Sequence, residues 1–124
     1  MESEFVQSAP KLAGHVLVDA RPPVYWDGTE PKDGHMPAGH IPGALNVPYT
    51  TLVDDALNVD LPAIRKVFQQ AGINEGDTVV GYCFIGQYAT ATLFAARLLG
   101  HPVKLYDDSM DDWNRRSLPV EKAK

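Results

Sequence analysis

The chain has 124 residues, enough for one domain with a hydrophobic core that needs neither disulfides nor metals. Hydrophobic residues make up 44% of the sequence and charged residues 22%, as in an ordinary soluble globular protein. The formal net charge of −5 argues against a nucleic-acid-binding protein and mildly against the attraction of anionic substrates.

The single cysteine excludes an internal disulfide and any paired-cysteine redox or zinc motif. Residues 1–10 lack the basic and apolar regions of a signal peptide, and no apolar run is long enough to span a membrane. We therefore expect a soluble protein in a reducing compartment, the cytoplasm.

The first strand candidate lies near the N-terminus. Residues 1–10 are polar and are expected to be loose unless their apolar side chains dock. Residues 16–19 are mostly apolar and predict a buried strand that ends at Asp19, two residues before Arg21. Groups just beyond the strands of a parallel sheet face the ligand crevice or brace its loops. For Asp19 and Arg21, an ion pair or hydrogen bonds that brace neighbouring loops are favoured over a catalytic role.

A region rich in Gly and Pro follows, over residues 24–48, with Tyr25 and Trp26 as the expected anchors. Residues 44–47, between two prolines, predict a short strand. His40 follows another histidine by five residues, but no third ligand has the spacing typical of a metal site. We expect the His40 ring to hydrogen-bond to the backbone.

The next helix has clear start and stop signals. Asp60 is the expected N-cap of a helix over Leu61–Ala71, and Gly72 is the expected stop. Its apolar residues fall on one face at helical spacing: Leu61, Ile64, Val67, Phe68 and Ala71.

The cysteine follows the central strand candidate. Thr78–Tyr82 is apolar and β-branched and predicts a buried strand. Cys83 comes next, then a short segment containing Gly86, then a helix over residues 89–99 that Gly100 ends. This order directs main-chain N–H groups and the positive end of the helix dipole at the loop, which favours the thiolate of Cys83.

This context alone leaves two interpretations of Cys83 open. A lone cysteine at the end of a buried strand is commonly a small core hydrophobe. The strand, loop and helix by themselves favour the reactive and the inert interpretation about equally.

The last elements complete an α/β pattern. Residues 103–106 predict another strand, and residues 110–116 a short helix that carries Trp113. Strands that alternate with helices predict a mainly parallel sheet flanked by helices on both faces. We expect a single domain over residues 1–124, with its core at about residues 12–121.

Four stretches, in this order, resemble the rhodanese domain family. They are Val-Asp-Ala-Arg at 18–21, Gly-His-Ile-Pro-Gly-Ala-Leu-Asn-Val-Pro at 39–48, Tyr82-Cys83 with Gly86 three residues on, and Tyr106-Asp107 before Trp113. The resemblance covers most of the chain. Either the Gly-His-Ile-Pro-Gly-Ala stretch or the cysteine loop would be weak alone, but together they are specific, and they favour a reactive Cys83.

The resemblance implies a sulfurtransferase in which Cys83 accepts a sulfane sulfur, becomes a persulfide and passes the sulfur to a thiophilic acceptor. Main-chain N–H groups of the next six residues would hold the donor and the anionic persulfide. These residues are Phe84, Ile85, Gly86, Gln87, Tyr88 and Ala89. Supporting roles are assigned to Asp19, Arg21, His40 and Asp108.

The implied partners are a small-molecule sulfur donor such as thiosulfate, a thiol or cyanide acceptor, and a protein persulfide as a further candidate. No metal, organic cofactor, nucleic acid or membrane is required.

Two departures from the family affect the choice of donor. Many family loops carry Arg or Lys near the cysteine, whereas residues 84–88 are uncharged here, and Asp108 stands where Gly is frequent. Thiosulfate, a dianion, would lose charge-assisted contacts with this loop. If thiosulfate is nevertheless a good donor, then Arg21, Arg115 or Arg116 must line the pocket.

Two other functional classes are compared with the sequence features of this chain. Phosphatases that share this fold place Arg six positions after the cysteine, but Ala89 stands there in this chain, which argues against a phosphatase. A non-enzymatic binding or sulfur-carrier module within a larger assembly is the stronger alternative.

Overall fold

The computed structural model describes residues 3–30, 38–52, 60–84, 89–107 and 109–122. Four strands form one sheet in the order β2-β1-β3-β4, and every described pair is parallel. The strands are β1 (His15–Asp19), β2 (Leu45–Asn46), β3 (Thr78–Tyr82) and β4 (Val103–Leu105). β3, which leads to the cysteine, therefore lies inside the sheet between β1 and β4.

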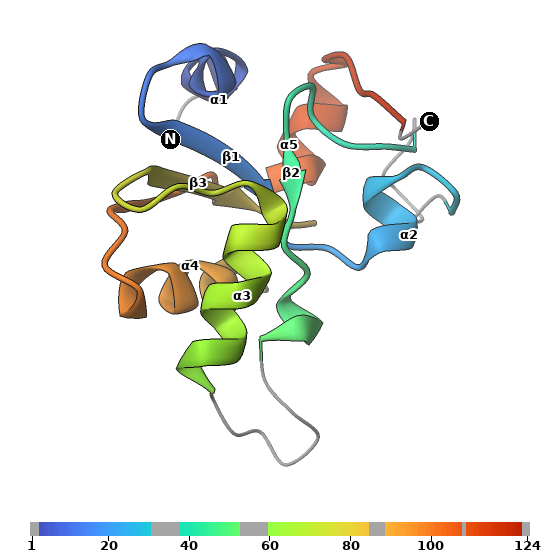
Figure 1. Cartoon of the computed structure of the whole chain (residues 1–124). Helices are drawn as coiled ribbons and strands as arrows, with labels where there is room; N and C mark the ends of the chain where they lie inside the picture. The colour runs from blue at the N-terminus through green and yellow to red at the C-terminus, as the bar shows by residue number, and fades with distance from the viewer. Residues whose placement is uncertain (1–2, 31–37, 53–59, 85–88, 108, 123–124) are drawn as a thin grey trace.

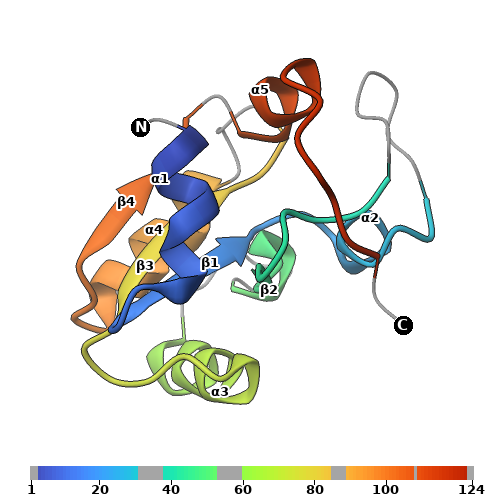
Figure 2. The same ribbon diagram turned by 90° about the horizontal axis from the view of Figure 1, so that it is seen from above.

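Helices cover both faces of this sheet. α1 (Ser3–Ser8) and α5 (Ser109–Arg115) lie on one face, and α3 (Leu61–Ala71) and α4 (Ala89–Leu98) lie on the other (Figures 1 and 2). The predicted α/β fold, with a parallel sheet between two helical layers, is confirmed. No helix among the described residues is long and apolar enough to cross a membrane.

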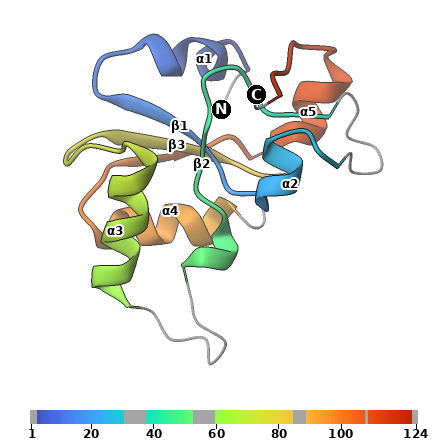
Figure 3. The same cartoon turned by 45° about the vertical axis from the view of Figure 1, so that its right-hand side comes forward.

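Shorter helical segments complete the described elements. They are η1 (Ala9–Lys11), α2 (Pro23–Trp26) and η2 (Tyr49–Thr51). The sequence does not predict α2, because two consecutive prolines, Pro22 and Pro23, are unfavourable inside a helix. Proline fits the first turn of a helix, where its missing N–H would have no intrahelical partner, and α2 begins at Pro23. Figure 3 shows α2 below α5, on the right-hand side of the view.

Alternation along β3 divides its side chains between two hydrophobic clusters. Val80 and Tyr82 pack with Val6 and Trp113 on the α1 and α5 face. Val79 packs on the opposite face, against residues of α3 and α4. Because successive strand side chains point to opposite faces, β3 is buried on both sides.

Gly81 brings α4 close to β3. A Cβ at Gly81 would lie 2.8 Å from Cδ2 of Leu93, a side chain on α4. Real Cβ atoms essentially never approach another heavy atom that closely, so the glycine permits this packing. The helix that follows the cysteine loop is thereby seated directly on the strand that precedes it.

α3 has the predicted ends but a smaller buried face. The Asp60 side chain accepts a hydrogen bond from the Ala63 N–H at 3.3 Å, and Gly72 ends the helix at φ 90°. Ile64 and Phe68 are buried, whereas Leu61, which belongs to the same apolar face, is 41% exposed. The first turn of α3 lies at the end of the helix that is farther from the sheet (Figure 1).

Several boundaries differ slightly from the predictions. β2 is shorter than residues 44–47, β4 ends at Leu105, α4 ends at Leu98 and α5 begins at Ser109. The N-terminal segment, expected to be loose unless its apolar residues dock, does dock, since Val6 is fully buried in the core.

Candidate active site

Cys83 directly follows β3 at the carboxyl edge of the sheet. Its side chain is fully buried in a small cluster with Ala20 and Ala89. Ala20 follows β1 and Ala89 begins α4, so three segments enclose the cysteine. In open parallel sheets this edge is where ligands bind.

The backbone at the cysteine is attached to the start of α5. The Cys83 N–H donates to Oγ of Ser109 at 3.0 Å. The Cys83 carbonyl accepts from the Met110 N–H, and the Phe84 carbonyl accepts from the Asp111 N–H, both at 3.0 Å. The first N–H groups of a helix have no intrahelical acceptors, so these carbonyls supply what α5 lacks.

Sequence reasoning did not single out Ser109 or the contact with α5. Ser109 stands next to Asp108, which was named, but its side-chain role depends on a partner 26 residues away. No spacing rule connects these positions.

Asp19 and Arg21 form a buried ion pair beside the cysteine segment. Arg21 Nη2 lies 2.7 Å from Asp19 Oδ2, and Arg21 Nε lies 3.0 Å from both carboxylate oxygens. Arg21 Nη2 also donates to the Gly39 carbonyl at 2.6 Å. The bracing ion pair predicted from sequence is confirmed.

The same guanidinium lies over the aromatic ring of the residue after the cysteine. Arg21 Cζ is 5.4 Å from the centroid of Phe84 and 5.9 Å from that of Tyr82. Burial by itself lowers the pKa of Arg21, but the Asp19 carboxylate outweighs it and raises that pKa. Arg21 is therefore a permanent cation whose charge is neutralised within the protein.

Tyr82 connects the central strand to the Gly-His-Ile-Pro stretch. Its hydroxyl oxygen accepts a hydrogen bond from the Ile41 N–H at 3.0 Å. Burial raises the pKa of Tyr82 well above its ordinary value, and the nearby Asp19 carboxylate acts in the same direction. Tyr82 consequently stays a neutral phenol and holds Ile41 against the sheet.

His40 braces the same stretch from the other side. Its Nδ1 is 2.7 Å from the Trp26 carbonyl, and the two rings stack at 4.4 Å. The backbones of His40 and Glu121 pair in both directions at 2.8 Å, and His40 Nε2 is 3.6 Å from the Glu121 carboxylate. The predicted backbone hydrogen bond of His40 is confirmed, and these contacts give it a bracing position.

Of the remaining predicted site residues, some lie within the described part of the chain and others do not. Phe84 is nearly buried, and the Tyr25 ring meets its ring edge-on at a centroid distance of 5.1 Å. The predictions for Ile85, Gly86, Gln87, Tyr88 and Asp108 lie outside the described residues.

The other arginines considered for the donor pocket also face carboxylates. Arg116 Nε lies 2.9 Å from Asp112 Oδ1, and Arg115 Nε lies 3.3 Å from Asp111 Oδ2. Burial by itself raises the pKa of Asp112, but hydrogen bonds from Tyr106 and Arg116 outweigh it and lower that pKa. Like Arg21, these two cations already have anionic partners.

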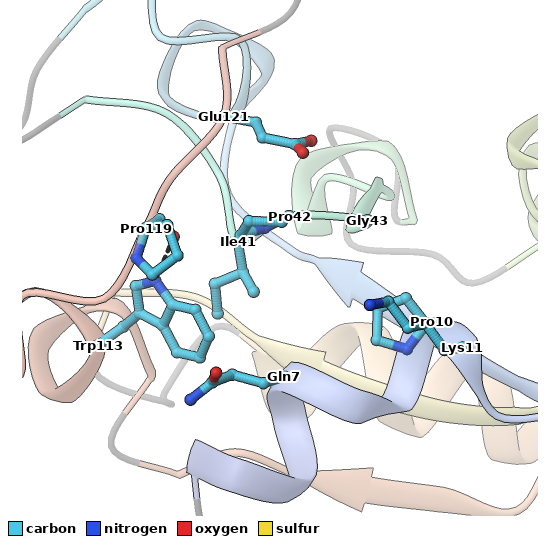
Figure 4. Close-up of a pocket in the computed structure, with 9 residues that line it drawn as sticks. All are labelled: Gln7, Pro10, Lys11, Ile41, Pro42, Gly43, Trp113, Pro119 and Glu121. Carbon is cyan, nitrogen blue, oxygen red and sulfur yellow. Dashed lines mark hydrogen bonds between the residues drawn. The ribbon is translucent and has the colours of Figure 1, made fainter.

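A pocket of about 310 Å³ lies elsewhere, between α1, the turn at residues 41–43 and the C-terminal segment (Figure 4). Figure 4 shows Trp113 and Pro119 on one side of it and Pro10 and Lys11 on the other. Neither Cys83 nor Phe84 is among the described residues that line this pocket. We therefore do not assign a reaction at Cys83 to it.

The fold and the position of Cys83 define an open parallel α/β domain with one cysteine between its central strand and the following helix. The family model of the rhodanese-like domain matches residues 4–116. The chain belongs to this family.

Its relatives include enzymes and a carrier. Over 112 residues the chain is 37% identical to a 3-mercaptopyruvate sulfurtransferase of Escherichia coli K12, covering 87% of this chain and 40% of the relative. It is 34% identical over 117 residues to the sulfur carrier protein TtuD of Thermus thermophilus, covering 86% and 41%.

The fold matches solved structures. The crystal structure of SseA from Escherichia coli, described as a rhodanese fold, superposes with a TM-score of 0.73 at 30% identity. That match covers 88% of this chain and 41% of the other. The chain thus spans about 40% of the length of the curated relatives it matches.

Proposed function

We propose that the protein is a sulfurtransferase that carries a sulfane sulfur on Cys83. The observation that carries the proposal is the position of the cysteine, at the carboxyl end of the central strand with its backbone hydrogen-bonded to α5. Sulfurtransferases among its relatives support the reaction class.

The proposed reaction has two displacement steps. In the first, the Cys83 thiolate attacks the outer sulfur of the donor, a new S–S bond forms, and the donor leaves with the electrons of its broken bond to that sulfur. With thiosulfate, the leaving group is sulfite. In the second, a thiolate or cyanide attacks the outer sulfur of the persulfide, and the Cys83 thiolate is released.

The residues after Cys83 would hold the charged intermediate. We propose that N–H groups from Phe84 to Ala89 stabilise the anionic persulfide, as donors preorganised around a developing charge do in other sites. Gly86 would let the loop close around it.

The donor is proposed to be weakly charged, or a persulfide presented by another protein. Arg21, Arg115 and Arg116 are each paired with a carboxylate, and the loop sequence contains no basic residue. A dianion would therefore find little unpaired positive charge among the described groups near Cys83. The sulfur carrier relative is consistent with transfer between proteins.

Mass spectrometry tests the proposed function directly. The reduced protein is incubated with thiosulfate, with 3-mercaptopyruvate or with glutathione persulfide, then digested and mapped. We expect one added sulfur atom on the peptide that contains Cys83, released on addition of cyanide. The proposal is wrong if none of the three donors adds sulfur to Cys83.

A loop substitution tests the selectivity. Gln87→Arg places a guanidinium in the proposed loop, and one charge-assisted hydrogen bond is worth roughly 1.5–3 kcal/mol. We expect the KM for thiosulfate to fall about ten- to a hundredfold, with the gain shrinking as salt is added. Arg65→Gln on the exposed surface of α3 serves as a charge control and should leave that KM unchanged.

The selectivity proposal fails if the unmodified protein already saturates at low thiosulfate concentration and Gln87→Arg does not improve it. Such a result would leave the persulfide on Cys83 intact as a proposal, because loading is measured separately.

A sulfur-carrier role without turnover is the second candidate, favoured by the similarity to the sulfur carrier protein. A carrier would load Cys83 once and hold the persulfide in the presence of small thiols and cyanide. An enzyme would release it repeatedly, so multiple-turnover assays with a small-molecule acceptor separate the two.

A further inference from the structure

Two residues other than glycine have positive φ angles in the described part of the chain, Ser109 at 52° and Ser117 at 54°. L-residues rarely adopt this left-handed conformation, and they keep it only where surrounding contacts enforce it. Ser109 is fully buried, whereas Ser117 lies exposed beyond α5. The buried serine is the one that contacts the cysteine segment.

The Ser109 hydroxyl is both an acceptor and a donor of hydrogen bonds. Its Oγ accepts the N–H of Cys83 at 3.0 Å and donates to the carbonyl of Tyr106 at 2.7 Å. The Ser109 N–H also donates to the Tyr106 carbonyl at 3.1 Å. One side chain thus ties the end of β3 to the chain that leaves β4.

These contacts fix the backbone on both sides of the cysteine Cα. The peptide before Cys83 is held through its N–H by Ser109, and the peptide after it is held through its carbonyl by the Met110 N–H. When both peptide planes next to a Cα are fixed, the direction of its Cα–Cβ bond is fixed as well. The position of the thiol therefore depends on the start of α5.

We propose that Ser109 is a positioning residue for the Cys83 nucleophile, a role that rests on the proposed sulfur transfer. Its hydroxyl orients the peptide before Cys83 and occupies the N–H of that residue. The persulfide is then stabilised by the N–H groups that follow the cysteine rather than by the cysteine's own. Glycine would suit the φ angle of Ser109 better but has no hydroxyl, which accounts for a strained serine at this site.

Two substitutions separate the hydroxyl from the backbone conformation. Both variants remove the hydroxyl. Ser109→Gly also relieves the strain of the left-handed backbone conformation, whereas Ser109→Ala retains that strain. Ser117→Gly is the matched control, because it relieves the same conformation at an exposed serine without a described side-chain hydrogen bond. A loss caused by the hydroxyl appears in both Ser109 variants and not in the control.

We expect both Ser109 variants to lower kcat for sulfur transfer roughly 10- to 100-fold, the range for small misplacements of a reacting group. The KM for the donor should change less than about threefold, because Ser109 acts on the nucleophile rather than on donor binding. Hydrogen exchange of the Cys83 amide, followed by NMR, should accelerate at least about tenfold without its acceptor. Ser117→Gly should leave all of these values unchanged.

The amide exchange is independent of catalysis, so it distinguishes two kinds of failure. If the unmodified protein transfers no sulfur, the proposed function fails while the exchange still reports whether Ser109 holds the Cys83 peptide. The positioning role is overturned if kcat stays within about threefold of the unmodified enzyme in both variants. It is also overturned if the Cys83 amide stays equally protected, or if both variants lose the native fold.

Discussion

Replacing Cys83 with serine is expected to abolish sulfur transfer while the protein stays folded. A serine hydroxyl is not ionised at neutral pH and does not form a persulfide, so the first displacement has no nucleophile. Loss of a covalent nucleophile lowers kcat by at least about 10³-fold. The measurement is steady-state turnover with the donor that loads Cys83 best, together with circular dichroism of the variant.

The buried position of Cys83 requires a control for packing. Ala96→Ser also buries a hydroxyl, on α4 in the hydrophobic cluster between the sheet and α3, and should lower stability without abolishing turnover. Turnover that persists in Cys83→Ser would show that this residue is not the nucleophile. A variant that unfolds while Ala96→Ser stays folded would identify Cys83 as a core residue.

The second large effect is expected from the ion pair beside the cysteine. Arg21→Met removes the guanidinium and leaves the Asp19 carboxylate buried, with its charge-assisted contacts at 2.7–3.0 Å lost. Breaking a buried ion pair on one side typically costs about 3–5 kcal/mol, because the remaining charge is uncompensated. Urea denaturation should show a loss of this size in the free energy of unfolding.

An exposed ion pair supplies the comparison. Arg115 is 64% exposed and pairs with the half-exposed Asp111, and such surface pairs contribute about 0–1 kcal/mol. Arg115→Met should therefore change stability little. The double variant Asp19→Asn/Arg21→Met should recover much of the loss, since it removes the uncompensated charge. Equal stability losses for Arg21→Met and Arg115→Met would contradict the assignment of a buried, energetically coupled pair.

The α/β pattern could be predicted because its signals are local. The apolar run of Thr78–Tyr82, the Asp60 cap and the Gly72 stop each act within a few residues. Burial on both faces of β3 follows from its unbroken apolar character, and alternation with helices then requires parallel strands. The errors lay at element ends and in short segments, such as α2, where local preferences are weak.

The candidate nucleophile was also accessible from sequence, through its place after the central strand and the resemblance of the surrounding stretches. The hydrogen-bond partners of the backbone around it could not be predicted from sequence. Ser109 reaches Cys83 across 26 residues, and Tyr82 reaches Ile41 across 41. The left-handed conformation of Ser109 carries no residue-type signal, since it is set by contacts rather than by the serine itself.

Only the tertiary structure determines whether the positive charge of Arg21 is available to a sulfur donor. From sequence, Arg21 was both a bracing residue and a candidate to line the donor pocket. The fold places its guanidinium between the Asp19 carboxylate, the Gly39 carbonyl and the Phe84 ring, which leaves it 3% exposed. A sequence shows which groups carry charge, but whether that charge can reach a substrate depends on partners that only chain packing brings within hydrogen-bonding distance.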